Sequence, residues 1–302
     1  MVAKHVDPSA APPGPPSTLV ASLAWRETTR RARPTLFSMS RDDASKPDVA
    51  QRESERTFDR LIDEGQQRLG RSWSGLIATG VLGGLDVGVG VLALLLVEHA
   101  TGSKILGGLA FAVGLIALTL ARSELFTEDF LVPVAAVVTK TSTWFSLLRL
   151  WAVTMVMNLL GGWLIAAIIA GGFPSLRSTA AEAAKFYITL GTTWQAFALA
   201  LMGGFLITLM THMQHSTDSD GLRVVPATVV GFLLGAGQIN HAIVVSILCF
   251  TALHAGASFG YAEWFGLFAF AALGNLIGGL VLVTVLSLLQ VPDKVAAERR
   301  SN

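Results

Sequence analysis

His241 is the side chain in this sequence best suited to give or take a proton within an apolar stretch. It follows Gln238 and Asn240 in a long stretch, residues 224–262, that contains no Lys, Arg, Asp or Glu. An imidazole titrates near neutrality, and an ionisable side chain in a membrane span is costly and by default functional. In a second interpretation, which stays open, His241 only bonds a carbonyl group between helices.

The composition places the chain among membrane proteins. Of its 302 residues, 52% are hydrophobic and 14% are charged, and the mean hydropathy is +0.58. Soluble domains carry about 25% charged residues. The net charge of +1 gives no indication of nucleic-acid binding.

No residue set in the sequence favours catalysis. We find no nucleotide-binding loop and no nucleophile constellation, so we do not expect an enzyme. His212 and His215 lie near Asp218 and Asp220, but such side chains in a short loop are more often solvated, and we predict neither a metal site nor a cofactor. Cys249 lies in an apolar run and is expected to pack there.

The chain divides into four parts. A Pro/Ala/Ser/Arg-rich tail at 1–49 is expected to be disordered, and apolar spacings of three, four and seven predict an amphipathic cytoplasmic helix at 50–71. Residues 72–292 then carry six hydrophobic spans, and 293–302 form a cytoplasmic tail. A bilayer crossing needs about 20 mostly apolar residues. The spans are expected at 72–97, 105–139, 149–177 and 185–213, from about 224, and at 264–292.

The basic residues orient these spans. Cytoplasmic loops carry an excess of Lys and Arg. One set of loops and both ends of the span region hold Arg56, Arg60, Arg68, Arg71, Lys140, Arg149, Arg223, Lys294, Arg299 and Arg300. The opposite loops hold only Lys104, Arg177 and Lys185. Both termini are therefore predicted to be cytoplasmic.

Three features of the first half recur in the second half, in the same order and at similar separations. They are a Gly-Gly pair, a polar interruption of an apolar span, and an Asn-Leu-(Leu/Ile)-Gly-Gly run. Their positions are Gly83 and Gly203, Thr127 and His241, and Asn158 and Asn275. The ordered set indicates an internal repeat.

A repeat of three spans must be inverted, because an odd number of crossings reverses the second copy. Inverted repeats with one broken helix in each half are the architecture of channels and transporters, with the site near the midplane. Unwound backbone is tolerated at that depth only where protein or a watery cavity satisfies it. We therefore expect a pathway between residues 123–129 and 235–241, with Asn158 and Asn275 tying the broken-helix backbone to the bundle.

These motifs resemble the formate/nitrite transporter family over about residues 50–290. The residues that carry the resemblance are Glu124-Leu125-Phe126-Thr127, Asn240-His241 and the two asparagine-glycine runs. The pairing of Ala121-Arg122 with the run Leu125-Phe126-Thr127-Glu128 is most similar to the YfdC-type branch of the family. The resemblance implies an all-α polytopic protein of the bacterial inner membrane, a homopentamer of aquaporin-like protomers with broken second and fifth spans. Each protomer would pass formate, nitrite, lactate-like monocarboxylates or hydrosulfide.

The resemblance also implies roles for single residues. His241 matches the central histidine, beside Asn240. An anion that accepted a hydrogen bond or a proton from it could cross an apolar barrier as the neutral acid, because the bare anion is expensive to bury. Thr127 matches the threonine that neighbours this histidine, and it either fixes the histidine tautomer or caps a helix end. Leu125 and Phe126 match the hydrophobic constriction, which would exclude hydrated ions, although core packing explains them equally well. The helix N-termini at the breaks would favour an anion.

The charged residues around the first break depart from the family pattern. Glu124 matches its acidic position, but Glu128 and Asp129 stand where better-known members carry small or amide residues, and Arg122 is also unusual. Either Arg122 pairs with one of these carboxylates, or the group faces the pathway and its negative charge opposes free passage of anions.

The residues expected at the extracellular mouth of the pore also depart from the family pattern. The family commonly carries a lysine there, just before the fourth span, and Lys185 is the nearest lysine in this chain. Whether it substitutes is open. The outer constriction of the fifth span would be aliphatic, around Leu233 and Leu234.

The predicted function is passage of small monovalent anions through a pore in the lipid bilayer, either passively or coupled to protons. Two alternatives remain. The same fold could conduct a neutral solute such as water, ammonia or hydrogen sulfide, or it could be a closed membrane scaffold.

Overall fold

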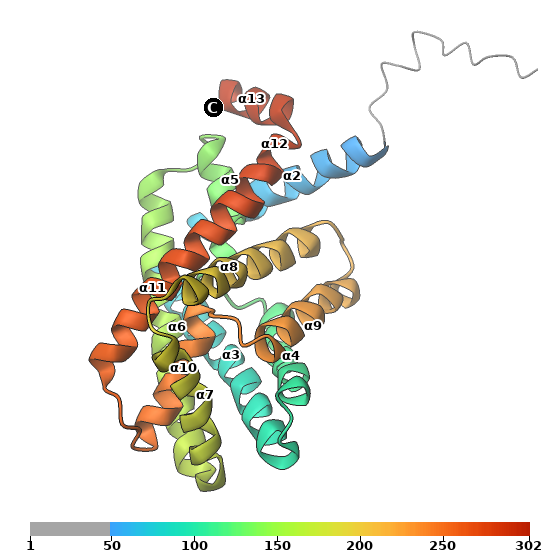
Figure 1. The fold of residues 1–302 in the computed structure, drawn as a ribbon. Helices are drawn as coiled ribbons and strands as arrows, with labels where there is room; N and C mark the ends of the chain where they lie inside the picture. Colours follow the sequence, from blue (N-terminus) through green and yellow to red (C-terminus); the bar gives the residue numbers. More distant parts are fainter. Residues whose placement is uncertain (1–48) are drawn as a thin grey trace, which may run out of the picture. The chain divides into compact units, whose positions relative to one another are not determined.

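The computed structural model describes residues 49–302, and regular structure in this range is entirely helical (Figure 1). The predicted all-α class is confirmed for these residues. The tail predicted at 1–49 lies outside the described residues, apart from Val49, where the first helix begins.

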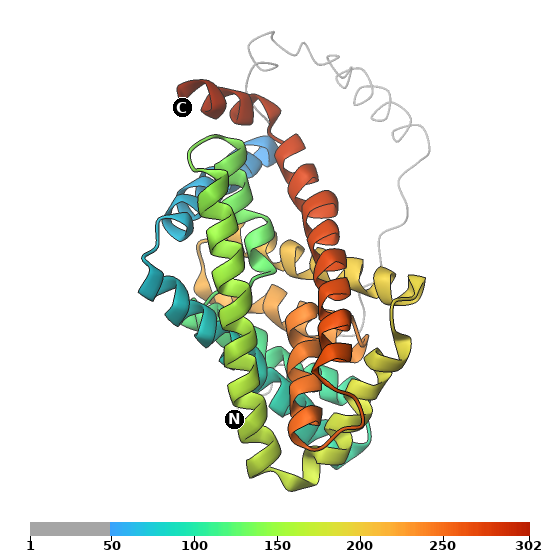
Figure 2. The same cartoon turned by 90° about the vertical axis from the view of Figure 1, so that its left-hand side faces the viewer.

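Five helical runs within 49–302 are long and apolar enough to cross a membrane, with mean hydropathies of 1.7 to 2.2. They are α3 (Trp73–Thr101), α4 (Lys104–Ala121), α6 (Trp144–Gly172), α8 (Trp194–His215) and the run Tyr261–Leu289. The last run is one continuous rod (Figure 2), made of α11 (Tyr261–Gly279), the π-helical turn η3 (Leu280–Val285) and α12 (Leu286–Leu289). Each run has at least 18 residues, close to the length of a bilayer crossing.

Two further apolar segments are interrupted. After α4, residues 122–127 leave the helix, a short 3-10 turn η1 (Glu128–Phe130) follows, and α5 (Val132–Val138) resumes. The second interruption separates α9 (Asp220–Ala236) from α10 (Ala242–His254). Both non-helical segments fall where the sequence showed its polar interruptions.

The connection between α6 and α8 differs from expectation. The sequence placed a fourth span from residue 185, but residues 174–190 form the 3-10 turn η2 (Pro174–Leu176) and a separate helix, α7 (Arg177–Leu190). Gly191 ends α7 at a φ of 58°, which disfavours a side chain. Thr193 then caps α8 by accepting a hydrogen bond from the Ala196 amide at 3.2 Å. The span therefore begins at Trp194.

Glycines allow the same close helix contact in both halves. A Cβ on Gly84 of α3 would collide with the carbonyl oxygen of Asn158 on α6. A Cβ on Gly204 of α8 would likewise collide with that of Asn275 on α11. The pair α4 and α9 joins the halves, where Gly235 lies against the backbone of α4. Small residues at such contacts are typical of membrane helix packing.

The amphipathic helix α2 (Val49–Leu69) packs its apolar face on α5. Phe58 and Leu61 are buried there, and Gly65 leaves no room for a Cβ, which would lie 2.6 Å from the Val132 carbonyl oxygen. The C-terminal helix α13 (Pro292–Ser301) is joined to α2 by an ion pair of 2.7 Å between Lys294 and Asp59.

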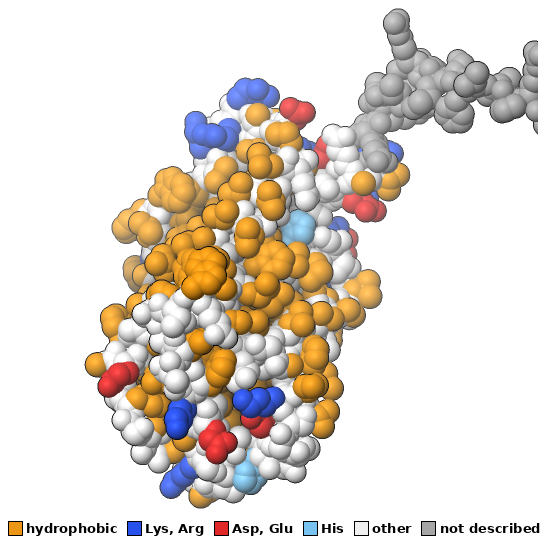
Figure 3. Space-filling view, in the orientation of Figure 1, with side chains coloured by type: hydrophobic (Ala, Val, Ile, Leu, Met, Phe, Trp, Pro, Cys, Tyr) orange, Lys and Arg blue, Asp and Glu red, His pale blue; other side chains and the backbone are white. Residues whose placement is uncertain are grey.

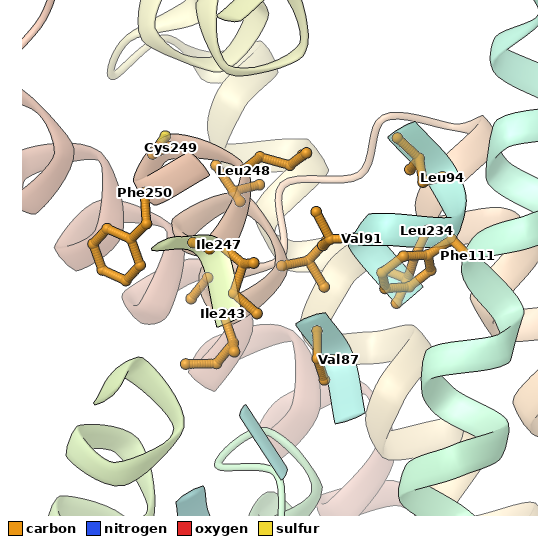
Figure 4. Close-up of a cluster of buried hydrophobic side chains, with 14 of the residues drawn as sticks. Val87, Val91, Leu94, Phe111, Leu234, Ile243, Ile247, Leu248, Cys249 and Phe250 are labelled. Carbon is orange, nitrogen blue, oxygen red and sulfur yellow. The ribbon is translucent and has the colours of Figure 1, made fainter. Parts of the chain in front are cut away.

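The core of residues 49–302 lies where α3, α4, α9 and α10 meet. Val87, Phe111, Leu234 and Ile247 are among its buried side chains (Figure 4). On the face drawn in Figure 3, exposed hydrophobic side chains cover most of the middle, and most charged side chains lie toward the two ends. Such a distribution suits a bilayer, whose interior is apolar.

Candidate functional site

The two helix interruptions meet at Thr127 and His241. The Thr127 hydroxyl lies 2.7 Å from Nε2 of His241, and both side chains are fully buried. His241 is also the N-cap of α10, where its Nδ1 accepts the Val244 amide proton at 3.4 Å. With Nδ1 accepting, the proton of the neutral ring is on Nε2, which donates to the Thr127 hydroxyl. The contact thus joins residues 114 positions apart in the chain.

Asn158 holds the backbone of the first interruption. Its Oδ1 accepts from the Phe126 amide at 2.8 Å, and its Nδ2 donates to the carbonyl oxygens of Glu124 at 2.8 Å and Gly80 at 2.7 Å. Backbone groups outside a helix need such partners when they are buried. The Asn158 side chain therefore replaces the missing helical hydrogen bonds.

Asn275 does the same at the second interruption. Its Oδ1 accepts from the Ala242 amide at 2.8 Å, and its Nδ2 donates to the carbonyl oxygens of Ala200 at 2.7 Å and Asn240 at 3.0 Å. The Asn240 side chain points its Nδ2 to the Ala196 carbonyl at 3.3 Å. The backbone of each interruption is thus held by one asparagine side chain, from α6 in the first half and from α11 in the second.

Leu125 and Phe126 precede Thr127 and are both buried. Leu125 belongs to the main hydrophobic core, whereas the Phe126 ring packs edge-on against Phe130, with 5.0 Å between centroids. Both side chains lie in the non-helical segment that carries Thr127.

Two acidic residues of the first break pair with arginines at the end of α2 and just after it, and this is the main feature that the sequence did not reveal. Arg71 forms an ion pair with Glu124 at 2.6 Å, and Arg68 forms one with Asp129 at 3.1 Å. Both carboxylates are fully buried. Arg122, which we considered as their partner, is 75% exposed and lies 3.4 Å from Asp220 instead. The left-handed backbone of Arg122, with a φ of 53°, ends α4 and turns its side chain outward.

Glu64 on α2 extends this ion cluster to the end of α8. It pairs with Arg68, and its other oxygen lies 2.7 Å from Nε2 of His215. Burial by itself would raise the pKa of the Glu64 carboxyl, but the Arg68 charge and the His215 contact outweigh it and hold the pKa well below its usual range. Since Nδ1 of His215 contacts the Thr211 carbonyl at 2.7 Å, both ring nitrogens are engaged within the protein.

A polar cavity of about 260 Å³ lies between α2, the first break and the ends of α8 and α9. Its lining includes Arg71, Glu128, Gln214 and Arg223. Glu128 is only 4% exposed.

A lysine other than the expected one lies beside the second break. Lys104, at the start of α4, places Nζ 3.3 Å from Oε1 of Gln238 and 6.0 Å from the ring centroid of Phe186. Lys185 lines a separate surface pocket with Glu182 and Phe186. The sequence did not predict this position of Lys104, because Lys104 belongs to the first half of the chain and approaches the second break only in the folded protein.

The fold and the site together define an integral membrane protein of interrupted apolar helices. The family model for the formate/nitrite transporter matches residues 55–289, so the chain belongs to this family. Family members are channels and transporters rather than enzymes.

Two solved structures have a similar fold. One, described as an FNT family ion channel, is 19% identical over 76% of this chain and 96% of its own, with a TM-score of 0.70. Another, a pentameric formate channel with formate bound, is 22% identical over 72% of this chain and 96% of its own, with a TM-score of 0.61. No protein of curated function matches the chain.

Proposed function

We propose that this chain forms a pore for small monovalent anions such as formate or nitrite, with His241 as the central hydrogen-bond or proton donor. The observation that carries the proposal is the buried contact between Thr127 and His241, where the two helix interruptions meet. The pentameric formate channel of similar fold supports the proposal, because the ligand bound to that protein is a small monovalent anion.

The mechanism follows from the neighbours of His241. A small anion that reaches the buried imidazole would accept a hydrogen bond from Nε2, in place of the Thr127 hydroxyl. To give the anion a proton, the ring would first take a second proton from water on Nδ1, so that loss of the Nε2 proton leaves a neutral imidazole. Leu125 and Phe126 would form an apolar constriction that excludes hydrated ions. A neutral acid would pass this constriction at lower cost than the anion. Thr127 would restore the resting tautomer after the substrate leaves.

The architecture that we propose has six spans as two inverted three-helix repeats. The interrupted pairs α4–α5 and α9–α10 would be the broken second and fifth spans of an aquaporin-like protomer. The pore would occupy residues 72–292, and the flanking segments 1–49, 50–71 and 293–302 would lie on the cytoplasmic side of a bacterial inner membrane. Membership of the YfdC-type branch is part of this proposal.

A homopentamer is proposed from the pentameric similar structure and from the many exposed apolar side chains of α3, α6 and α11. A cross-linking ladder of the purified protein should end at five copies. A ladder that ends at another number would remove this part of the proposal.

Flux in proteoliposomes tests the function. Formate, nitrite and hydrosulfide would each be measured at acidic and neutral pH, for the wild type and for His241→Asn. Uptake of one substrate that depends on pH, and changes in the variant, is the expected result. His99→Asn is the matched control, because His99 is exposed and its side chain hydrogen-bonds only to Thr179 among the described residues.

Absence of flux above empty liposomes, with intact oligomeric protein, would overturn the proposal. Water, ammonia and hydrogen sulfide permeability would then separate the neutral-solute alternative from a closed scaffold.

A further inference from the structure

Glu128 differs from its acidic neighbours in having no counter-charge of its own. It lines the polar cavity beside α2 and is 4% exposed. Among residues 49–302, no side chain forms a hydrogen bond or an ion pair with its carboxylate, whereas Glu124 and Asp129 each have an arginine.

The nearest arginines are already engaged. Arg68 bonds Glu64 and lies 3.1 Å from Asp129, and Arg71 lies 2.6 Å from Glu124. These two arginines therefore already pair with three carboxylates, which belong to Glu64, Glu124 and Asp129. The negative charge of the cluster exceeds its positive charge before Glu128 is added.

The charged groups on α8, α9 and the end of α4 are also paired. His215 contacts Glu64 at 2.7 Å. Arg122 and Arg223 line the same cavity but both lie beside Asp220, at 3.4 and 3.5 Å. The helix α5, which packs against the turn that carries Glu128, has no ionisable side chain.

A buried carboxylate without a counter-charge is held at lower cost as the neutral acid. The cavity of about 260 Å³ has room for several water molecules, which can exchange a proton with this acid. Glu128 also follows Thr127 directly in the chain, and the Thr127 hydroxyl touches His241. Glu128 thus lines the cavity and is bonded in the chain to the residue that contacts the central histidine.

We propose that Glu128 is a proton-exchange residue for the anion pathway at the cavity end of the pore. The inference rests on the proposed function. An anion in the cavity accepts the proton of the Glu128 carboxylic acid, so that the O–H bond of Glu128 breaks and an O–H bond forms on the substrate. The neutral acid moves on toward His241, and a proton from the surrounding solution, relayed by cavity water, reprotonates the Glu128 carboxylate. In the reverse direction the carboxylate accepts the proton of the outgoing acid.

Glu128→Gln tests this step, because the amide keeps the size of the side chain but cannot release a proton. Full-length protein in liposomes with a trapped pH dye would be given formate, and uptake and internal acidification would be recorded together across a pH series. A positioned acid or base contributes on the order of 100-fold or more to proton transfer. The variant should therefore lose at least about tenfold in protein-dependent proton entry, and its pH profile should flatten.

Two further variants separate this role from a structural one. Glu128→Asp keeps the acid and should restore most of the pH dependence. Glu53→Gln removes an exposed carboxylate of α2 that pairs with no described residue, and it should match the wild type. Wild-type uptake, acidification and pH profile in Glu128→Gln would overturn the proposal.

A second readout does not depend on transport. Infrared difference spectra of the wild type against Glu128→Gln should show a protonated-carboxyl band that disappears as pH rises. Absence of that band would refute the proton on Glu128. If the wild type passes none of the anions while the band is present, the proposed function fails and the assignment of the proton stands.

Discussion

Replacing Arg68 by methionine should strongly destabilise the protein. The Arg68 side chain is 10% exposed, pairs closely with Glu64 and Asp129, and lies 3.7 Å from Glu124. Removing one partner of a buried ion pair costs about 3–5 kcal/mol, because it leaves a buried charge without compensation. In this variant Arg71 still pairs with Glu124 and His215 still contacts Glu64. Asp129 is therefore the carboxylate that loses its closest counter-charge. We therefore expect the lower end of that range, about 3 kcal/mol.

Thermal unfolding of the purified protein measures this change. For a chain of this size, 1 kcal/mol shifts Tm by roughly 2–4 °C, so Arg68→Met should lower Tm by roughly 6–12 °C. Tryptophan fluorescence at a fixed scan rate is a suitable probe, since Trp151 donates to the Asp129 carbonyl at 2.9 Å. Arg52→Met is the matched control, because Arg52 is exposed on the same helix and pairs with no described residue.

A second substitution distinguishes charge from packing. Asp129→Asn in the Arg68→Met background removes the uncompensated charge, and it should recover about 1–2 kcal/mol. A Tm for Arg68→Met within about 2 °C of the wild type, or no recovery in the double variant, would refute the role assigned to the buried ion cluster.

Three further variants test other contacts. Because the pKa of Glu64 is lowered in the folded protein, its ionisation stabilises the fold above its unfolded pKa of about 4.3, and this stability is lost as pH falls below that value. Glu64→Gln should therefore be less stable than the wild type at neutral pH, with a gap that narrows in acid unfolding scans. Asn275→Leu leaves buried groups of the second break without partners and should cost about 3 kcal/mol or more by thermal unfolding, unlike an exposed Asn302→Leu control. Thr127→Val removes the hydroxyl beside His241, a contact worth about 1 kcal/mol, so formate flux should change about fivefold and Tm should fall by roughly 2–4 °C; unchanged flux would contradict a role for this contact.

Much of the helical frame and of the site could be located from the sequence. Asn158 and Asn275 stood out because each opens the same five-residue motif, and both lie at the interruptions. Thr127 and His241 were found because polar residues in apolar spans are rare and occurred at corresponding places. The two halves repeat the same packing problem, so the same residue types recur.

The ion partners of the first break could not be predicted. Arg68 lies on an amphipathic helix whose charged residues look solvated in the sequence, and Arg71 follows the end of that helix. Periodicity does not show which distant carboxylates these two arginines meet. Arg122 was the nearest cation in sequence, but its left-handed backbone directs it away. The helix α7 was missed because its apolar residues merged with the start of the next span.

Asn158 and Asn275 have a consequence for motion. The amides of Phe126 and Ala242 lie at helix interruptions, yet each donates at 2.8 Å to a fully buried asparagine oxygen. Amide hydrogen exchange at such positions requires an opening that breaks the tertiary contact and not only local fraying. In deuterium exchange these two amides should therefore be protected like those in the middle of α3 or α6. Passage of a substrate would then be a matter of side-chain rotation within a fixed backbone, on a timescale far shorter than that exchange.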